Sequence, residues 1–81
     1  MDEQIIERLR AGDAEGVTLL QTQYGPMVRY IVRGILHDAQ DAEECVSDVW
    51  LRVWQKCASF DPEKGTLAAW VTAVARNAAV D

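Results

Sequence analysis

The chain has 81 residues, of which 49% are hydrophobic and 26% are charged, a composition that fits one small globular domain and argues against disorder. No apolar run approaches the roughly 20 residues that a membrane-spanning helix needs, and the acidic start Met1-Asp2-Glu3-Gln4 lacks the pattern of a signal peptide, so we expect a cytoplasmic protein. The formal net charge of −5 argues, taken alone, against a duplex DNA binder, because such domains usually carry a basic patch.

Two short helices are predicted before residue 25. The first should run from Asp2 to Arg10 and end at Gly12, because glycine readily adopts the left-handed conformation of a helix terminus. Asp13 then has a side chain suited to capping a second helix over Ala14 to Tyr24. The apolar residues that we expect to face inward are Ile5, Ile6, Leu9, Val17, Leu20 and Tyr24.

Gly25-Pro26 predicts a break, because proline inside a helix removes a hydrogen bond and clashes with the preceding turn. Pro26 suits the first turn of a third helix, which should end near Leu36. The inward-facing residues of this third helix should be Met27, Ile31 and Ile35. Residues 38–41 are expected to form a turn.

A long helix should follow that turn. Asp41 and Glu44 have the spacing of a capping box, with Asp in place of Ser or Thr, so this helix should begin there and run to about Ala58. Residues 60–65 contain Pro and Gly and predict a loop, after which Thr66 can cap a last helix. The residues expected to face inward are Val46, Val49, Trp50, Val53, Trp54 and Cys57 on the long helix, and Leu67, Trp70, Val71, Val74 and Ala78 on the last. We therefore predict an all-α fold, a compact bundle of about five helices.

Cysteine and histidine, two residue types common in catalytic and metal sites, are few in this chain. Cys45 and Cys57 lie twelve residues apart in one predicted helix, about 18 Å along its axis, which is too far for a disulfide, so each should pack as a small hydrophobic residue. His37 is the single histidine, and the spacings of metal sites are absent from the sequence. Because no nucleophile–base pair or phosphate-binding loop is visible either, an enzyme is the least favoured class.

Four segments of the chain carry a recognisable pattern: Ile6-Glu7-Arg8 with Arg10-Ala11-Gly12-Asp13, Tyr24-Gly25-Pro26, Asp41-Ala42-Glu43-Glu44 with the run from Asp48 to Trp54, and the run from Phe60 to Thr66 with Ala69-Trp70 and Ala75-Arg76-Asn77. In this order and spacing they resemble region 2 of bacterial RNA polymerase sigma factors of the extracytoplasmic-function (ECF) type, and the resemblance extends over nearly the whole chain. The resemblance implies a sigma region 2 fold over residues 1–81. It also implies a transcription initiation factor domain that is not an enzyme, needs no cofactor, binds core RNA polymerase, and recognises and helps melt the promoter −10 element.

The resemblance assigns polymerase binding to the long helix, which would dock on a coiled coil of the largest catalytic subunit. The implied contacts are Glu44, Ser47, Asp48, Leu51 and Arg52. Glu44 and Asp48 are four residues apart, and two such carboxylates destabilise a helix slightly unless a cationic partner arrives. A solvated acidic face is the alternative interpretation. At Ser47 a larger amide side chain is common in the family, so polymerase affinity is expected to be weaker there.

The resemblance assigns promoter DNA, specifically the non-template strand of the −10 element, to the loop and the last helix. The implied contacts are Phe60, Lys64, Gly65, Thr66, Arg76 and Asn77. Their chemistry suits DNA binding, because Lys64 and Arg76 can neutralise phosphates, Gly65 permits close approach, and the Asn77 amide can bond a base edge. Other interpretations stay open, because Phe60 and Trp70 also suit a core, Thr66 also suits a helix cap, and Arg76 with Asn77 also suit an ordinary solvated surface.

Besides Ser47, a second departure from the family pattern bears on function. The chain stops at Asp81, before the basic run and the −35-binding domain that usually follow, so we expect a fragment of a longer protein, with an anti-sigma factor as a further partner. The acidic net charge favours an alternative, a sigma-like helical protein-interaction module that binds polymerase without recognising DNA.

Overall fold

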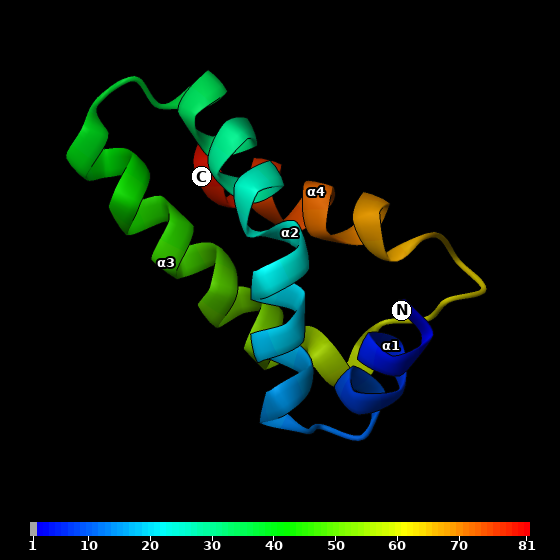
Figure 1. Cartoon of the computed structure of the whole chain (residues 1–81). Helices are drawn as coiled ribbons and strands as arrows, with labels where there is room; N and C mark the ends of the chain where they lie inside the picture. The colour runs from blue at the N-terminus through cyan, green and yellow to red at the C-terminus, as the bar shows by residue number, and fades with distance from the viewer. Residues whose placement is uncertain (1) are drawn as a thin grey trace.

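The computed structural model describes residues 2–81, and these residues form an all-α bundle, as predicted (Figure 1). Its elements are α1 (Asp2–Arg10), α2 (Ala14–Ile35), α3 (Ala39–Lys56), the short 3-10 turn η1 (Cys57–Ser59) and α4 (Leu67–Val80). The bundle measures about 35 × 22 × 20 Å. No helix within the described residues is both long and apolar enough to cross a membrane.

The break predicted at Gly25-Pro26 is wrong, because α2 runs through Pro26 as a single helix. Proline deprives the carbonyl of Thr22 of its helical partner, but both residues are exposed, so water can satisfy that carbonyl. Leu20 before the proline and Val28 after it are fully buried in the same core. Tertiary packing on both sides of Pro26 therefore outweighs the local free-energy cost of a proline inside a helix. As a result, the described residues form four α-helices in place of about five.

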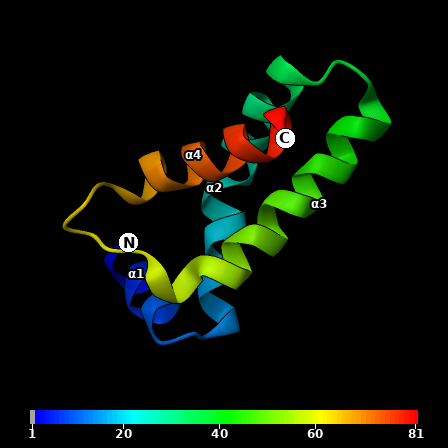
Figure 2. The ribbon, with the colours of Figure 1, turned by 180° about the vertical axis from the view of Figure 1, so that it is seen from behind.

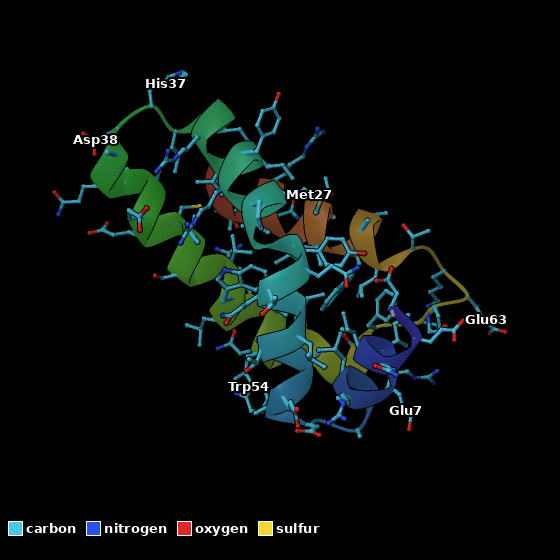
Figure 3. All side chains as sticks on the ribbon, in the orientation of Figure 1. Glu7, Met27, His37, Asp38, Trp54 and Glu63 are labelled. Carbon is cyan, nitrogen blue, oxygen red and sulfur yellow. The ribbon has the colours of Figure 1, made fainter. Side chains whose placement is uncertain are left out.

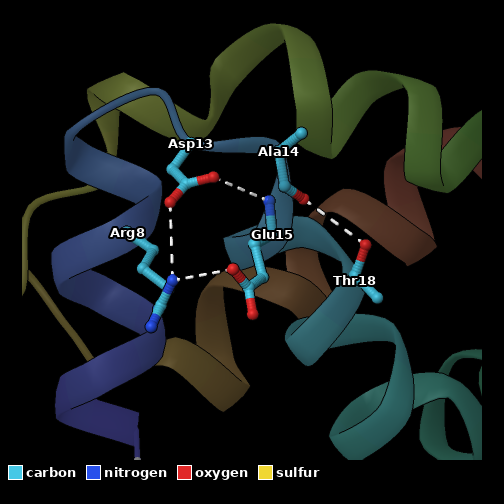
Figure 4. Close-up of polar contacts among 5 residues, drawn as sticks. All are labelled: Arg8, Asp13, Ala14, Glu15 and Thr18. Carbon is cyan, nitrogen blue, oxygen red and sulfur yellow. Dashed lines mark hydrogen bonds and ion pairs between the residues drawn. The ribbon is translucent and has the colours of Figure 1, made fainter.

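The corner between α1 and α2 follows the prediction and is tightly packed (Figure 4). Gly12 has a φ of 74°, in the left-handed region, and the Asp13 carboxylate accepts a hydrogen bond of 3.0 Å from the backbone N–H of Glu15. Arg8 reaches across from α1 to form ion pairs with Glu15 at 2.9 Å and Asp13 at 3.5 Å. A Cβ at Gly16 would lie only 2.9 Å from the Cβ of Arg8, so the two helices cross where a glycine allows it.

The start of α3 lies earlier than predicted. The cap is Asp38, whose carboxylate accepts a hydrogen bond of 3.0 Å from the backbone N–H of Asp41, and the helix begins at Ala39. Asp41 therefore sits in the first turn, where its negative charge favours the positive end of the helix dipole. The helix ends at Lys56, and η1 carries the chain on to Ser59. Sequence spacing alone did not separate Asp38 from Asp41, because both residues have capping chemistry three positions before a polar or acidic residue.

The core lies around α2, which contacts α1, α3 and α4 (Figures 1 and 2). Its buried residues are Ile5, Leu9, Leu20, Val28, Val32, Ala42, Cys45, Val49, Val53, Cys57, Phe60, Leu67, Val71, Val74, Ala75 and Ala79. Two residues predicted to face inward do not: Trp54 is 44% exposed and Ile35 is 36% exposed. Trp54 follows Val53, which occupies the buried line of α3, so its side chain leaves the helix about 100° away. Ile35 is the last residue of α2, where the bundle ends.

Candidate functional site

The five residues assigned to polymerase binding all lie on α3, away from its buried line of Ala42, Cys45, Val49 and Val53. Glu44, Ser47 and Leu51 are exposed, whereas Asp48 and Arg52 are partly covered. Their spacing of three and four residues stacks them on consecutive turns of one helix. We call this set, Glu44, Ser47, Asp48, Leu51 and Arg52, the α3 surface.

The sequence suggested that Glu44 and Asp48 both need a cationic partner from outside the chain, and the structure differs from this for Asp48. Arg52 forms an ion pair through Nε with Asp48 at 2.9 Å, and it donates through an Nη atom to Asp81, beyond the end of α4, at 2.8 Å. The hydrogen bond to Asp81 is the main reason that the pKa of Arg52 lies above its ordinary value. The cationic partner of Asp48 is thus supplied within the chain, and among the described residues Glu44 has no ion pair. The contact with Asp81 was invisible to sequence reasoning because 29 residues separate the pair.

Apolar side chains extend the α3 surface. Leu51 is 54% exposed, and Trp54, one turn further along α3, is 44% exposed and points outward (Figure 3). Exposed large apolar groups beside charged ones are typical of binding surfaces, where aromatic residues supply much of the affinity. Sequence reasoning missed Trp54 as a site residue because it was counted in the hydrophobic stripe of the core.

A small pocket lies between the loop before α4 and the first turns of that helix. Its volume is about 290 Å³, and its lining is Ser59, Phe60, Asp61, Lys64, Gly65, Thr66, Ala69 and Trp70, which we call the loop pocket. Four of the six predicted DNA-binding residues therefore gather here. Phe60 is only 4% exposed and its ring meets that of Trp70 with centroids 5.3 Å apart, so it forms a wall of the pocket and not a free stacking platform.

Local hydrogen bonds give the loop pocket its shape. The Asp61 carboxylate accepts a hydrogen bond from the backbone N–H of Glu63 at 3.0 Å. The backbone carbonyl of Asp61 accepts a second one from the N–H of Lys64 at 3.0 Å. Thr66 caps α4 as predicted, its hydroxyl oxygen accepting from the N–H of Ala69 at 3.1 Å. Glu63 projects from the tip of the loop (Figure 3). The pocket is thus assembled by backbone turns that do not depend on a ligand.

The other two predicted DNA-binding residues, Arg76 and Asn77, lie elsewhere. They line a larger groove of about 1040 Å³ between the end of α4 and the second half of α2. Asn77 follows Thr66 by eleven residues, which places it about 16 Å further along the helix axis. The six predicted DNA-binding residues therefore do not line a single pocket. The α2 residues that face Arg76 across this groove were not singled out from the sequence.

Groups suited to catalysis or metal binding do not gather in the part of the chain that is described. Within residues 2–81 no three His, Cys, Asp or Glu side chains lie close enough together to hold a metal ion. Cys45 and Cys57 are free and buried, as predicted, and burial, together with the nearby charge of Asp48, raises the pKa of the Cys45 thiol. His37 lies at the exposed turn between α2 and α3 (Figure 3).

The fold and its surfaces define a small all-helical domain with exposed sites on α3 and around α4. The family model described as sigma-70 region 2 matches residues 20–81, and the chain therefore belongs to the sigma-70 region 2 family. The predicted resemblance is confirmed at this level.

Curated relatives are sigma factors of the ECF type. The ECF RNA polymerase sigma factor RpoE of Cereibacter sphaeroides is 46% identical over 43 residues, which are 53% of this chain and 24% of RpoE. The ECF RNA polymerase sigma factor SigK of Mycolicibacterium vanbaalenii is 30% identical over 77 residues, 95% of this chain and 39% of SigK. SigK of Mycobacterium sp. strain KMS is 32% identical over 77 residues, 95% of this chain and 40% of that protein. The chain thus spans about a quarter to two fifths of these relatives, and no solved structure matches it significantly.

Proposed function

We propose that this chain is a transcription initiation factor domain that binds core RNA polymerase through the α3 surface and recognises and helps melt the promoter −10 element through the loop pocket. It acts in the cytoplasm and catalyses nothing itself, since polymerase supplies the active site. These curated relatives are more than twice as long as this chain. In a complete protein, we assign the −35 element to a separate domain and regulation to an anti-sigma factor.

The observation that carries the proposal is the loop pocket on a sigma region 2 fold. Lys64, Gly65 and Thr66, expected to handle DNA, surround one hollow of about 290 Å³, near the lower limit of small-molecule pockets. An unstacked base is a flat group of the size that small pockets hold. Proteins bind single strands by stacking the bases on apolar or aromatic side chains and by hydrogen-bonding the base edges through nearby polar groups. Extruding the base costs a few kcal/mol, which contacts in the pocket would offset.

The chemistry of the α3 surface suits a protein partner with positive charge around an apolar centre. Leu51 and Trp54 offer exposed apolar area, and Glu44 offers a carboxylate that no cation within residues 2–81 neutralises. A coiled coil of the largest polymerase subunit with basic side chains beside an apolar stripe would complement this arrangement.

The second candidate function is a sigma-like module that binds polymerase without recognising DNA, and the net charge of −5 favours it. Both candidate functions include binding to polymerase, and only the first includes recognition of DNA. Polymerase binding and DNA recognition are therefore tested by separate experiments.

Polymerase binding is tested with Glu44→Lys against Glu7→Lys, which makes the same change of net charge on α1 (Figure 3). Reversing Glu44 should cost on the order of 2 kcal/mol of affinity for core polymerase if its partner cation becomes buried. Glu7→Lys should leave the affinity unchanged. Equal effects of the two variants, measured by titration at moderate salt, would remove α3 from the polymerase interface.

Recognition of the −10 element is tested at Gly65. A Cβ there would meet nothing within 4 Å, so Gly65→Val leaves the fold intact while placing a branched side chain at the pocket. The variant should keep its polymerase affinity and lose base preference at one position of the −10 element, measured by transcription from promoters randomised there. Unchanged base preference would favour the module without a DNA role.

A further inference from the structure

Positive charge is concentrated in the groove between α2 and α4, although the chain as a whole is acidic. Three of the chain's eight Lys and Arg residues, Arg29, Arg33 and Arg76, line it, and no Asp or Glu does. The remaining lining residues are Pro26, Tyr30, Ile31, Gly34, Ile35, Asn77 and Val80. We call this set the arginine groove. Figures 1 and 2 show the end of α4 beside the second half of α2.

These guanidinium groups are poorly neutralised. Within residues 2–81 no carboxylate forms an ion pair with Arg29 or Arg76, and Arg33 has only a long contact of 3.8 Å with Glu43, both side chains being about two thirds exposed. By contrast, Arg8 and Arg52 each have two ion-pair partners. The arginine groove is therefore a local positive site in which charge complementarity selects an anion.

Two further residues of the groove have no explanation in the packing of the bundle. Tyr30 is 82% exposed, so its ring contributes little to the core and stands beside the arginines. Gly34 lies inside α2, where glycine is a weak helix former, yet a Cβ there would meet nothing within 4 Å. An exposed aromatic ring among cations and a bare stretch of helix backbone together suit a ligand that approaches closely and carries both negative charge and flat groups.

We propose that the arginine groove holds the sugar-phosphate backbone of promoter DNA, which makes Arg29, Tyr30 and Arg33 of α2 DNA-contacting residues beside Arg76. The inference rests on the proposed function, since it identifies α2 as the second wall of its DNA-binding surface. Guanidinium groups bind phosphate oxygens through paired hydrogen bonds, and such contacts position DNA without reading its sequence.

The arrangement along α4 makes the loop pocket and the groove two contacts of one DNA. They lie at opposite ends of the same helix, about 16 Å apart along its axis, and at about 3.4 Å per base step this corresponds to about five nucleotides of a stacked strand. A base held in the loop pocket and phosphates held in the groove can therefore belong to the same promoter segment.

The first test uses the chain alone, so that its outcome does not depend on polymerase. A fork-junction DNA, a short duplex continuing into a single strand, is titrated into isotope-labelled chain and backbone amide shifts are followed. Shifts at residues 29–34 together with Arg76, absent for a polyglutamate peptide at equal charge concentration, are expected. No shift at those residues, or equal shifts with polyglutamate, overturns the proposal, and the latter result would indicate an acidic protein segment as the occupant.

The second test measures binding of the same fork-junction DNA to the chain in complex with core polymerase. Arg29→Gln and Arg33→Gln should each weaken binding several-fold and lower the slope of log K against log salt by about 1, with base preference unchanged. Arg10→Gln on α1 makes the same charge change outside the groove and should alter neither quantity. If the α2 variants match Arg10→Gln while wild-type chain binds polymerase and selects −10 sequences, the groove is not a DNA site although the proposed function holds.

Gly34→Ala separates a binding role from a structural one. Alanine should raise the melting temperature, because it strengthens the helix and meets no neighbour. It should nevertheless weaken binding of fork-junction DNA, because the added methyl group occupies the groove. A variant that is more stable and binds DNA as well as wild type would show that no ligand approaches the backbone at this position.

Discussion

The α3 surface and the surface around α4 are built in different ways. The α3 surface comes from consecutive turns of one helix, and its exposed features are a carboxylate, Glu44, and the apolar side chain of Leu51. The surface around α4 combines the loop pocket with the arginine groove, and three separate segments of the chain line it. The first can therefore be inferred from residue spacing, whereas the second exists only once the bundle has folded.

The two surfaces also explain how an acidic chain can be proposed to bind DNA. The net charge of −5 is a sum over the whole chain, and the arginine groove contains three cations and no carboxylate. Association with a polyanion depends on the local field at the contact as well as on the total charge. Net charge alone therefore does not describe the face between α2 and α4, where the cations are concentrated.

The largest expected effect compares two tryptophans, Trp70 in the loop pocket and Trp54 beside the α3 surface. Trp70 is half-buried against Phe60, whereas Trp54 on α3 is 44% exposed. Trp70→Ala should lower the free energy of unfolding by about 3 kcal/mol, the lower end for aromatic truncation in a core. In a domain of this size that corresponds to a fall in melting temperature of more than about 10 °C.

Trp54→Ala is the matched control, since the same atoms are removed from a surface position. It should change the free energy of unfolding by less than about 1 kcal/mol. Thermal denaturation followed by circular dichroism measures both variants. Equal losses of stability in the two variants would mean that Trp70 contributes no more to the packing of the core than the exposed Trp54 does.

The next effect concerns the charge of the α3 surface. Asp48→Lys should cost on the order of 2 kcal/mol of polymerase affinity if the partner charge of Asp48 becomes buried in the complex. The substitution also places a cation beside Arg52, which in the wild-type chain holds Asp48 at 2.9 Å. Base preference in the −10 element should stay unchanged, because the surface around α4 is intact. Polymerase affinity equal to wild type at moderate salt would exclude Asp48 from the interface.

Residue spacing predicted the elements of the fold well, and local chemistry explains where it failed. Asp13, Gly12 and Thr66 act as predicted because a helix terminus is decided by one or two neighbouring residues. Pro26 was predicted to end a helix because its cost is local, whereas the burial of Leu20 and Val28 that outweighs it is tertiary.

The candidate site shows the same division between local and tertiary information. The residues of the α3 surface share a helix, so their spacing alone placed them together. Arg76 and Asn77 were assigned to DNA together with the loop, but the sequence alone did not place the loop relative to these later turns of the helix. Arg29 and Arg33 were missed because nothing local marks two arginines on a helix as facing a third one 43 residues or more away along the chain.

A smaller effect is expected for base reading by Asn77. Asn77→Ala should lose about 1 kcal/mol of discrimination at one base position, the lower end for such contacts, because the residue is exposed. That position should differ from the one affected by Gly65→Val, since the two residues lie in separate pockets. Transcription from promoters randomised across the −10 element reports both positions in one experiment. Coincident positions would show that the two sites act on a single base, and a uniform loss of output for Asn77→Ala would make its role structural.

The smallest effect tests the ion pair that joins the α3 surface to the end of α4. Arg52 of the α3 surface donates to Asp81, beyond the last turn of α4, at 2.8 Å, and the backbone N–H of Asp81 bonds the carbonyl of Asn77. Asp81→Asn removes the charge from this pair while keeping an oxygen acceptor, so the end of α4 should fray slightly more. Hydrogen exchange at the backbone amides of positions 80 and 81 should be faster in the variant at low salt, and the difference should shrink at high salt, because screening weakens exposed pairs.

Glu63→Gln, which removes a carboxylate outside any ion pair of the described residues, should leave exchange at the end of α4 unchanged. If exchange there does not respond to Asp81→Asn even at low salt, Arg52 is not paired with Asp81 in solution and retains only its pair with Asp48. The net charge of the α3 surface together with Asp81 is then not held in one cluster, and polymerase docking would depend on Leu51 and Trp54 more than on carboxylates.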